Sequence, residues 1–266
     1  MKLTKIKDVS IFNGQPDVEV AMSVECYKGD LYAVSRQMNL VKYMESQLVL
    51  HKLDQDFNIT SSEVLVAGED PRLFIYKDEL YCISWTFNHN KKDLDIFLYN
   101  ITTRTKTSLH NADLRYNGKN WTPFVYNGSL YFIYALQPLV ILKYVEPDLV
   151  KLHYSEVNTN HINSLSFGSG GIGNIRAGSQ SIYKNGALHL FSRTGTPNPH
   201  IIHFTTLDPV TFKTDTICLE PDRRSGVHDP YGYFQYQGKE YISTTESDSL
   251  WSNNTKWFKN SIYQVN

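Results

Sequence analysis

The chain has 266 residues, with 26 Lys and Arg against 27 Asp and Glu, and its net charge is −1. This balance argues against a protein that holds nucleic acid through broad phosphate electrostatics. Hydrophobic residues make up 41% of the sequence, which is enough for a packed core. The sequence contains no apolar run of about 18 residues, so no membrane-spanning helix is expected.

The N-terminal segment MKLTKIKDVSIFNGQ has no apolar core of the kind that a signal peptide needs, so we expect a cytoplasmic protein. The three cysteines, Cys26, Cys82 and Cys218, are odd in number and form no CxxC pair. We therefore expect neither a disulfide framework nor a metal site.

One unit recurs along the chain: a polar loop, a strand, a tight polar turn, and a strand that opens with a ring-bearing residue. Its five copies cover residues 18–36, 69–87, 119–136, 175–194 and 228–247. The matched ring positions are Tyr32, Tyr81, Tyr131, His189 and Tyr241, and their spacings are 49, 50, 58 and 52. A period of about 50 residues made of strand pairs is typical of propeller blades.

A second, weaker strand pair follows the first in several units, as at 48–65, 95–109 and 200–217. Four strands in each of five units predict an all-β, five-bladed propeller that forms a single domain over residues 1–266. The segments LTKIKDVSIF (3–12) and NSIYQV (260–265) are both strand-like and could share one blade that closes the ring. A β-sandwich with accidental spacing is the alternative.

The predicted geometry places a site. The residues that begin each first strand and those that end the second strand should converge on one face of the disc, because they are equally far from the turn. These positions are rich in carboxylates, cations and aromatic rings. They are Glu69, Asp70 and Arg72 with Trp85 and Phe87; Lys119, Asn120 and Trp121 with Gln137; Arg176 and Gln180 with Arg193; His228 and Asp229 with Glu246; and Asp17 and Glu19 with Arg36.

Simpler explanations exist for these residues one by one. The Asp70-Pro71 and Asp229-Pro230 pairs could be turn and strand-start devices. Trp85 and Trp121 could be core aromatics, and Arg36 and Arg193 could pair with carboxylates for structural reasons only. A charged rim shared by five units favours a functional face over each of these separate explanations.

The segments GEDPRLFIYKDELYCISWTF (68–87) and GKNWTPFVYNGSLYFIYALQPLVILKY (118–144) resemble the second and third blades of glycoside hydrolase family 130 (GH130) proteins. That family contains β-mannoside phosphorylases and β-1,2-mannosidases on five-bladed propellers, with β-1,2-mannosyltransferases among related propellers. The resemblance implies that Asp70 is a general acid with a raised pKa, with Glu69 as the like charge that raises it. It implies that Arg72 holds a sugar hydroxyl or tunes Asp70.

Two forms of the reaction follow from the resemblance. An inverting hydrolase needs a second carboxylate as base, for which Asp229 and Glu246 are the candidates. A phosphorylase needs instead a cationic cradle for inorganic phosphate as co-substrate, with no other cofactor. The candidates for that cradle are Arg176, Arg193, Lys119 and His228. The candidates for stacking on pyranose rings are Trp121, Trp85 and Tyr231.

Residues 168–173 (GSGGIG) satisfy the GxGxxG pattern, but no helix is expected after them, so we expect a rim loop over the pocket and no dinucleotide site. The histidines His51, His89, His110, His153, His161 and His203 have no metal-ligand spacing, and we expect most of them at the surface.

Three functions stay open from the sequence. The first is an enzyme that cleaves or phosphorolyses a β-linked hexoside, most simply a mannoside. The second is a glycosyltransferase on the same scaffold, which builds a surface or storage glycan, and the third is a non-catalytic glycan-binding propeller. The expected partner is an oligosaccharide or a sugar phosphate, with no nucleic acid and no membrane, and a homo-oligomer is left open.

Overall fold

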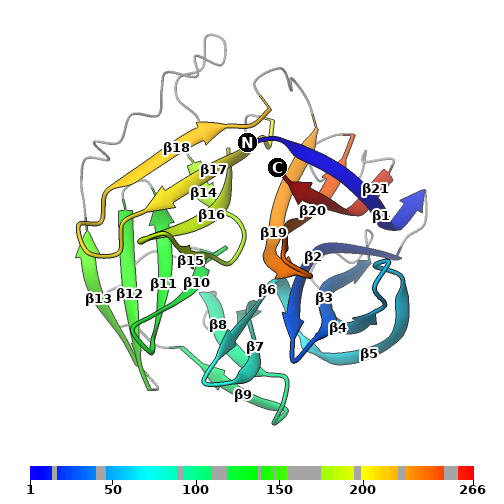
Figure 1. Ribbon diagram of the computed structural model, residues 1–266. Coiled ribbons are helices and arrows are strands. Elements are labelled where there is room, and N and C mark those ends of the chain that lie inside the picture. Colours follow the sequence, from blue (N-terminus) through cyan, green and yellow to red (C-terminus); the bar gives the residue numbers. More distant parts are fainter. Residues whose placement is uncertain are drawn as a thin grey trace.

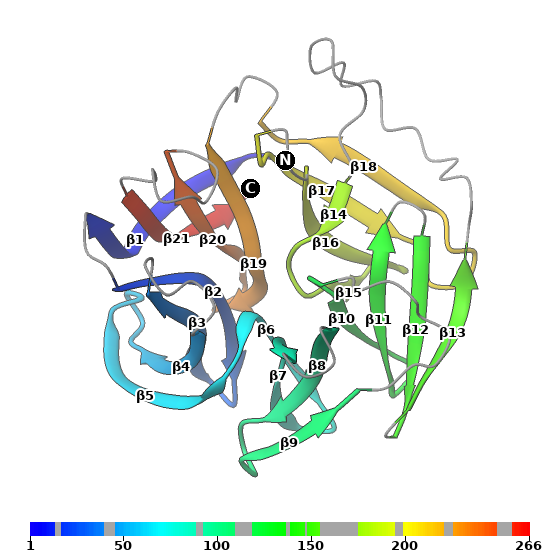
Figure 2. The same cartoon turned by 180° about the vertical axis from the view of Figure 1, so that it is seen from behind.

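The computed structural model of the protein is a five-bladed β-propeller, as the sequence predicts (Figure 1). It describes residues 1–13, 17–39, 46–88, 93–109, 119–136, 139–146, 148–154, 175–194, 199–220, 226–248 and 257–266. These residues form strands and turns and no helix, and therefore no helix that could cross a membrane. Seen from the other side, the five blades surround one central axis (Figure 2).

Each blade is an antiparallel sheet whose first strand lies at the axis. Blade 1 consists of β2 (Asp17–Tyr27), β3 (Asp30–Asn39), β4 (Ser46–Leu53) and β5 (Ile59–Ala67). Blade 2 consists of β6 (Glu69–Tyr76), β7 (Glu79–Asn88), β8 (Asp93–Asn100) and β9 (Thr105–Ser108). Blade 3 consists of β10 (Thr122–Tyr126), β11 (Ser129–Leu136), β12 (Leu139–Val145) and β13 (Asp148–Tyr154).

The last two blades differ from this plan in one feature each. Blade 4 has its inner strand in two pieces, β14 (Ile175–Ala177) and β15 (Ile182–Lys184), followed by β16 (Ala187–Thr194), β17 (Ile202–Leu207) and β18 (Thr214–Cys218). Blade 5 combines β19 (Val227–Tyr236), β20 (Lys239–Ser247) and β21 (Trp257–Val265) with the N-terminal β1 (Leu3–Asn13). The predicted closure by both terminal segments is thus confirmed.

The inner hairpins explain why these residues fold into blades. In all five, the two turn residues both have positive φ, from Lys28 (53°) and Gly29 (87°) in blade 1 to Gln237 (49°) and Gly238 (74°) in blade 5. This conformation matches the twist of antiparallel strands and is easiest for Gly and Asn. The turn therefore fixes the register of each hairpin.

The same register recurs in every blade. The ring positions Tyr32, Tyr81, Tyr131, His189 and Tyr241 face Glu25, Phe74, Phe124, Ile182 and Phe234 on the inner strand. Three of these pairs are stacked aromatics, with centroid distances of 5.1 to 5.8 Å. They belong to hydrophobic clusters that join one blade to the next. In blade 1 a carboxylate, Glu25, takes the place of the apolar partner.

The expectation that the scattered histidines lie mostly at the surface is wrong for two of them. His51 is 1% exposed, and its ring nitrogens lie 2.8 Å from Ser35 Oγ and 2.7 Å from Ser62 Oγ. His203 is fully buried in blade 4. His89, His110 and His161 lie outside the described residues.

Candidate active site

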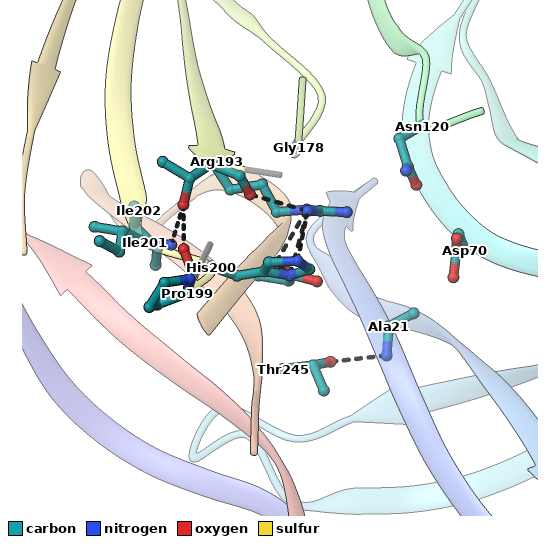
Figure 3. Close-up of polar contacts among 12 residues, drawn as sticks. Ala21, Asp70, Asn120, Gly178, Arg193, Pro199, His200, Ile201, Ile202 and Thr245 are labelled. Carbon is teal, nitrogen blue, oxygen red and sulfur yellow. Dashed lines mark hydrogen bonds and ion pairs between the residues drawn. The ribbon is translucent and has the colours of Figure 1, made fainter. Parts of the chain in front are cut away.

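One backbone position per blade organises the central face. It is the seventh residue before the first turn residue of each inner hairpin, and it is occupied by Ala21, Asp70, Asn120, Gly178 and Pro230. In β2 and β6 the register of the ladder shifts here, which is the mark of a β-bulge. Ala21, Asp70 and Asn120 have φ of 56°, 48° and 69°. The left-handed backbone turns the side chain of this residue away from the alternation of the strand, so blades 1 to 3 present three different side chains here, those of Ala21, Asp70 and Asn120 (Figure 3).

Asp70 lies between two cations from neighbouring blades. Arg36 NH1 is 3.4 Å from Asp70 Oδ1, and Lys119 Nζ is 3.8 Å from Asp70 Oδ2. Arg36 also holds the adjacent carboxylate, with NH2 2.7 Å from Glu69 Oε2. Asp70 is 7% exposed and Glu69 is 7% exposed. The structure thus brings together four of the predicted site residues, a buried pair of carboxylates and two cations.

The expectation of a raised pKa at Asp70 is wrong for the free protein. Burial favours the neutral form of Asp70, but the surrounding cations outweigh it and lower the pKa to about 2. These cations are Lys119, Arg36, Arg72 and Arg193. The raised pKa belongs to Glu69, where burial outweighs the attraction of Arg36 and gives a value of about 7. The sequence identified the pair but not which member binds the proton more tightly.

Arg72 is a hub that joins four blades. It is 1% exposed, and its NH2 donates to Asn120 Oδ1 at 3.1 Å. Its other donors go to the backbone carbonyls of Gly178, Asp70 and Pro71, and the guanidinium lies 4.5 Å from the ring centroid of Tyr231. Of the two roles implied by the resemblance, this geometry favours tuning over sugar binding, because Arg72 is engaged on every side by the protein. Arg72 holds the bulged backbone of Asp70 in place.

A second charged group lies on blades 4 and 5. Arg193 Nε is 3.0 Å from Asp229 Oδ1, and His200 Nδ1 is 2.8 Å from the same oxygen. Arg193 NH1 is 3.2 and 3.3 Å from the two ring nitrogens of His200, so the guanidinium lies against the imidazole (Figure 3). Burial opposes the ionisation of Asp229, but Arg193 and His200 lower its pKa. Asp229 is therefore an ionised, ion-paired carboxylate.

Two further predicted residues surround this group. Arg176 pairs with Arg193 across the hairpin and is exposed, so it presents its charge to solvent near Asp229. Tyr231 is 3% exposed, and burial raises the pKa of its phenol well above 10. Arg72 covers one face of the Tyr231 ring. That face is therefore not available for the predicted stacking on a sugar.

His228 and Glu246 pair across blade 5 as predicted, but they contact other elements than those around Asp70. His228 Nδ1 is 2.6 Å from Glu220 Oε1. Glu246 binds Lys5 Nζ at 2.8 Å and the hydroxyl of Tyr263 at 2.6 Å. Burial opposes the ionisation of Glu246, but His228 and these partners lower its pKa to about 2. The contacts of Glu246 are thus with the outer strands β1 and β21.

The two predicted tryptophans are core residues that also line a slot beside Asp70. Trp121 packs against Phe132 and Tyr134, with centroid distances of 5.8 and 5.4 Å. Trp85 faces Glu69 across the hairpin as expected, and Lys119 lies over its ring at 4.5 Å. Phe87 packs against the same core cluster, and Gln137 and the 168–173 loop lie outside the described residues.

Gln180 is placed differently from the prediction that it lies near Arg193. The bend between β14 and β15 crosses the axis, and Gln180 Nε2 donates to Val24 O and Glu25 Oε2 in blade 1, both at 3.2 Å. The same bend accepts hydrogen bonds from Arg72 in blade 2 and Thr122 in blade 3. A Cβ on Gly178 would lie 2.7 Å from Pro230 in blade 5. The bend therefore contacts all four other blades.

Glu25 makes stability depend on pH. Burial raises its pKa to about 7, against the hydrogen bonds from Cys26 and Gln180. Because this value lies above the 4.5 of a free glutamate, the stabilisation is complete below about pH 4.5 and is lost as pH rises through about 7.

We expect Glu25→Gln to flatten this dependence. Between pH 5 and pH 8, the melting temperature of the wild type should fall further than that of the variant, by at least roughly 2–4 °C. Glu63→Gln, at an exposed ion pair with Arg104, is the matched control and should follow the wild type. Parallel pH curves for wild type and Glu25→Gln would contradict the assignment.

His200 is the site residue that sequence reasoning missed. It lies two residues before the third strand of blade 4, and third strands begin on the same face as first strands, so this position could have been included. Among the described residues, no group of three His, Cys, Asp or Glu side chains is placed to hold a metal ion.

Structural comparison finds the same fold in glycoside hydrolases and phosphorylases. The chain is similar to a glycoside hydrolase of the GH130 family of mannoside phosphorylases that targets β-1,2 mannosidic linkages in Candida mannan, with 13% identity, a TM-score of 0.61, and coverage of 92% of this chain and 84% of that one. It is similar to a mannose phosphorylase from Leishmania mexicana in complex with a phosphate ion, with 12% identity, a TM-score of 0.59, and coverage of 93% and 84%.

A third similar structure is a GH43 β-xylosidase/α-arabinofuranosidase from a compost microbial metagenome, with 9% identity, a TM-score of 0.60, and coverage of 100% and 94%. No protein-family model and no curated protein matches the chain. The resemblance to GH130-like five-bladed propellers is therefore confirmed at the level of the fold.

Proposed function

We propose that the protein is a carbohydrate-active enzyme that cleaves a β-linked hexoside, a mannoside in the simplest case, by inverting phosphorolysis. The observation that carries the proposal is a central site with five cationic side chains against three carboxylates in a chain whose net charge is −1. The cations are Arg36, Arg72, Lys119, Arg176 and Arg193, and the carboxylates are Glu69, Asp70 and Asp229. Arg36, Arg72 and Arg193 are buried and match the three carboxylates, so Lys119 and Arg176, which reach solvent, are the surplus that favours an anionic substrate.

Phosphorolysis is favoured over hydrolysis by the state of the remaining carboxylates. A hydrolase needs a second carboxylate free to take a proton from water, on the far side of the sugar. Asp229 is bound by Arg193 and His200, and Glu246 is bound by Lys5 and Tyr263. In phosphorolysis the phosphate oxygen is itself the nucleophile, so neither group has to act as a base.

The low pKa of Asp70 fits a proton donor that becomes active only with phosphate bound. In the free protein the nearby cations keep Asp70 ionised. A bound phosphate dianion would offset their charge, and a bound sugar would remove solvent, so both would raise the pKa of Asp70. Asp70 could then give its proton to the leaving oxygen while a phosphate oxygen attacks C1 and the C1–O bond breaks. Glu69, with a pKa of about 7, is the nearest proton reservoir.

Arg176 is expected to bind the phosphate, because it is the exposed cation beside Arg193. Arg176→Ala should raise the KM for phosphate about 10- to 100-fold, the effect of losing a hydrogen bond to a charged group, and leave the melting temperature unchanged. The measurement is the formation of α-mannose 1-phosphate from β-manno-oligosaccharides, followed by phosphorus NMR at several phosphate concentrations. Arg104→Ala, at an exposed ion pair on blade 2, is the control.

Free mannose formed at the same rate with and without phosphate would contradict phosphorolysis and support hydrolysis. A transferase is the second candidate, because the same cations suit the phosphate of a sugar donor. Incubation with mannose 1-phosphate and with GDP-mannose, followed by analysis of the products, tests it.

A further inference from the structure

A slot beside Asp70, between blades 2 and 3, has polar groups besides Asp70 that the proposed reaction does not use. Its volume is about 10 Å³, roughly the room that one water molecule needs. The polar groups that line it are Asp70, Ser84, Trp85 and Asn120. Its apolar walls come from Ile83, Ile96 and Trp121.

Two N–H donors on the slot have no acceptor among the described residues: Trp85 Nε1 and Asn120 Nδ2. Both side chains belong to residues that are more than nine-tenths buried, with exposures of 8% and 6%. A buried donor without an acceptor costs roughly 1–3 kcal/mol, so two such groups on one small slot call for a common partner.

The orientation of the Asn120 amide is fixed by its neighbour. Arg72 NH2 lies 3.1 Å from Asn120 Oδ1, and a guanidinium can only donate hydrogen bonds. The oxygen of the amide must therefore face Arg72, and the NH2 group is the end left for the slot. Figure 3 shows Asn120, two residues before β10, next to Asp70 in β6.

Acceptors complete the set. The carboxylate of Asp70 is ionised and can accept only. Ser84 Oγ gives its proton to Glu69 O at 2.6 Å, so its lone pairs stay available. The slot thus offers two donors and two acceptors, which is the complement of a single oxygen that accepts twice and donates twice.

We propose that this slot is a binding site for one water molecule, which accepts from Trp85 Nε1 and Asn120 Nδ2 and donates to Asp70 and Ser84. This water connects the hub residue Arg72, through Asn120, to the carboxylate of Asp70. It gives that carboxylate a hydrogen-bond donor in addition to Arg36 and Lys119. A sugar hydroxyl accepts the same two hydrogen bonds but donates only one, so it could replace the water when substrate binds and would donate to Asp70 or Ser84, not to both.

The direct test is the Trp85 indole proton. The chain has four tryptophans, so the indole region of a nitrogen–proton correlation spectrum should contain four signals, and Trp85→Phe assigns one of them by its loss. We expect this signal to show an Overhauser effect to a long-lived water. Trp257→Phe, the same substitution on β21, should remove a different signal and leave the water contact in place.

Crystallography of the free protein and of a complex with mannose 1-phosphate distinguishes the two sources of the oxygen. Density for one oxygen in the slot of the free protein supports the proposal, whether the complex keeps this water or replaces it with a hydroxyl. A slot that is filled only in the complex, or an indole signal without a water contact, overturns it.

The catalytic consequence rests on the proposed function. Trp85→Phe removes the hydrogen bond from Trp85 Nε1 to the water that donates to Asp70, and it should lower kcat about 5- to 10-fold. The density and the indole signal do not depend on turnover. The water site and the phosphorylase proposal can therefore fail separately.

Discussion

Asp70→Asn should lower the turnover of a β-mannoside by phosphate at least about 10³-fold, because an amide cannot give a proton to the leaving oxygen. The protein should still fold and bind sugar, since Asn fits the positive φ of 48° at this position. The measurement is kcat for α-mannose 1-phosphate formation at saturating phosphate, with calorimetric binding of the sugar alongside.

A modest loss of stability should accompany this loss of activity. The pKa of Asp70 is held at about 2, below its usual 3.8, so the ionised form stabilises the fold above about pH 4, and this contribution disappears as pH falls through 2. The variant should lose about 2 kcal/mol at neutral pH. Asp54→Asn, in the exposed turn between β4 and β5, is the matched control and should keep full activity. Turnover retained by Asp70→Asn would remove the proposed chemistry.

Arg72→Lys should have the largest effect on stability of any single substitution in the site, with a loss of about 3–5 kcal/mol in the free energy of unfolding. A lysine has one ammonium and cannot reach the carbonyls of Asp70 and Gly178 and the amide of Asn120 together. Those acceptors would be left buried without donors. Chemical denaturation of the variant measures the loss.

Loss of activity should accompany the loss of stability at Arg72, because the bulge that aims Asp70 depends on it. Arg104→Lys, at an exposed pair with Glu63, is the control and should change stability by less than about 1 kcal/mol. An Arg72→Lys variant as stable as the wild type would show that the hub is not needed to hold the four blades together.

The sequence was sufficient to predict the architecture because the period of about 50 residues gives the number of blades and the turns give the inner hairpin of each blade. Turns such as Asn127-Gly128 and Asn185-Gly186 fix the register, and an equal count back from each turn leads to the central face. The convergence of Arg36, Asp70 and Lys119 could be predicted from that count alone.

What the sequence could not provide depends on contacts between blades. Glu69 has a higher pKa than Asp70 because burial outweighs the nearby cations at Glu69, whereas the cations outweigh burial at Asp70. This balance depends on the distances of Arg36 and Lys119 from each carboxylate. The placement of Gln180 beside Glu25 rests on a break in the inner strand of blade 4, which an alternating pattern does not reveal. His200 was missed because it lies before the third strand of blade 4, whereas the count from the turns covers only the first two strands of each blade.

The bulge shared by several inner strands limits which chemistry this ring can host. In blades 1 to 3 the residue seven places before the turn has left-handed backbone, which Asp and Asn tolerate far more readily than Glu or Gln. Such a position can exchange its acid for an amide or a small residue, as at Asp70, Asn120 and Ala21, without disturbing the ladder beyond it. Few residue types can therefore replace one another at this position near the axis. The longer carboxylate of the site, Glu69, occupies the preceding position instead.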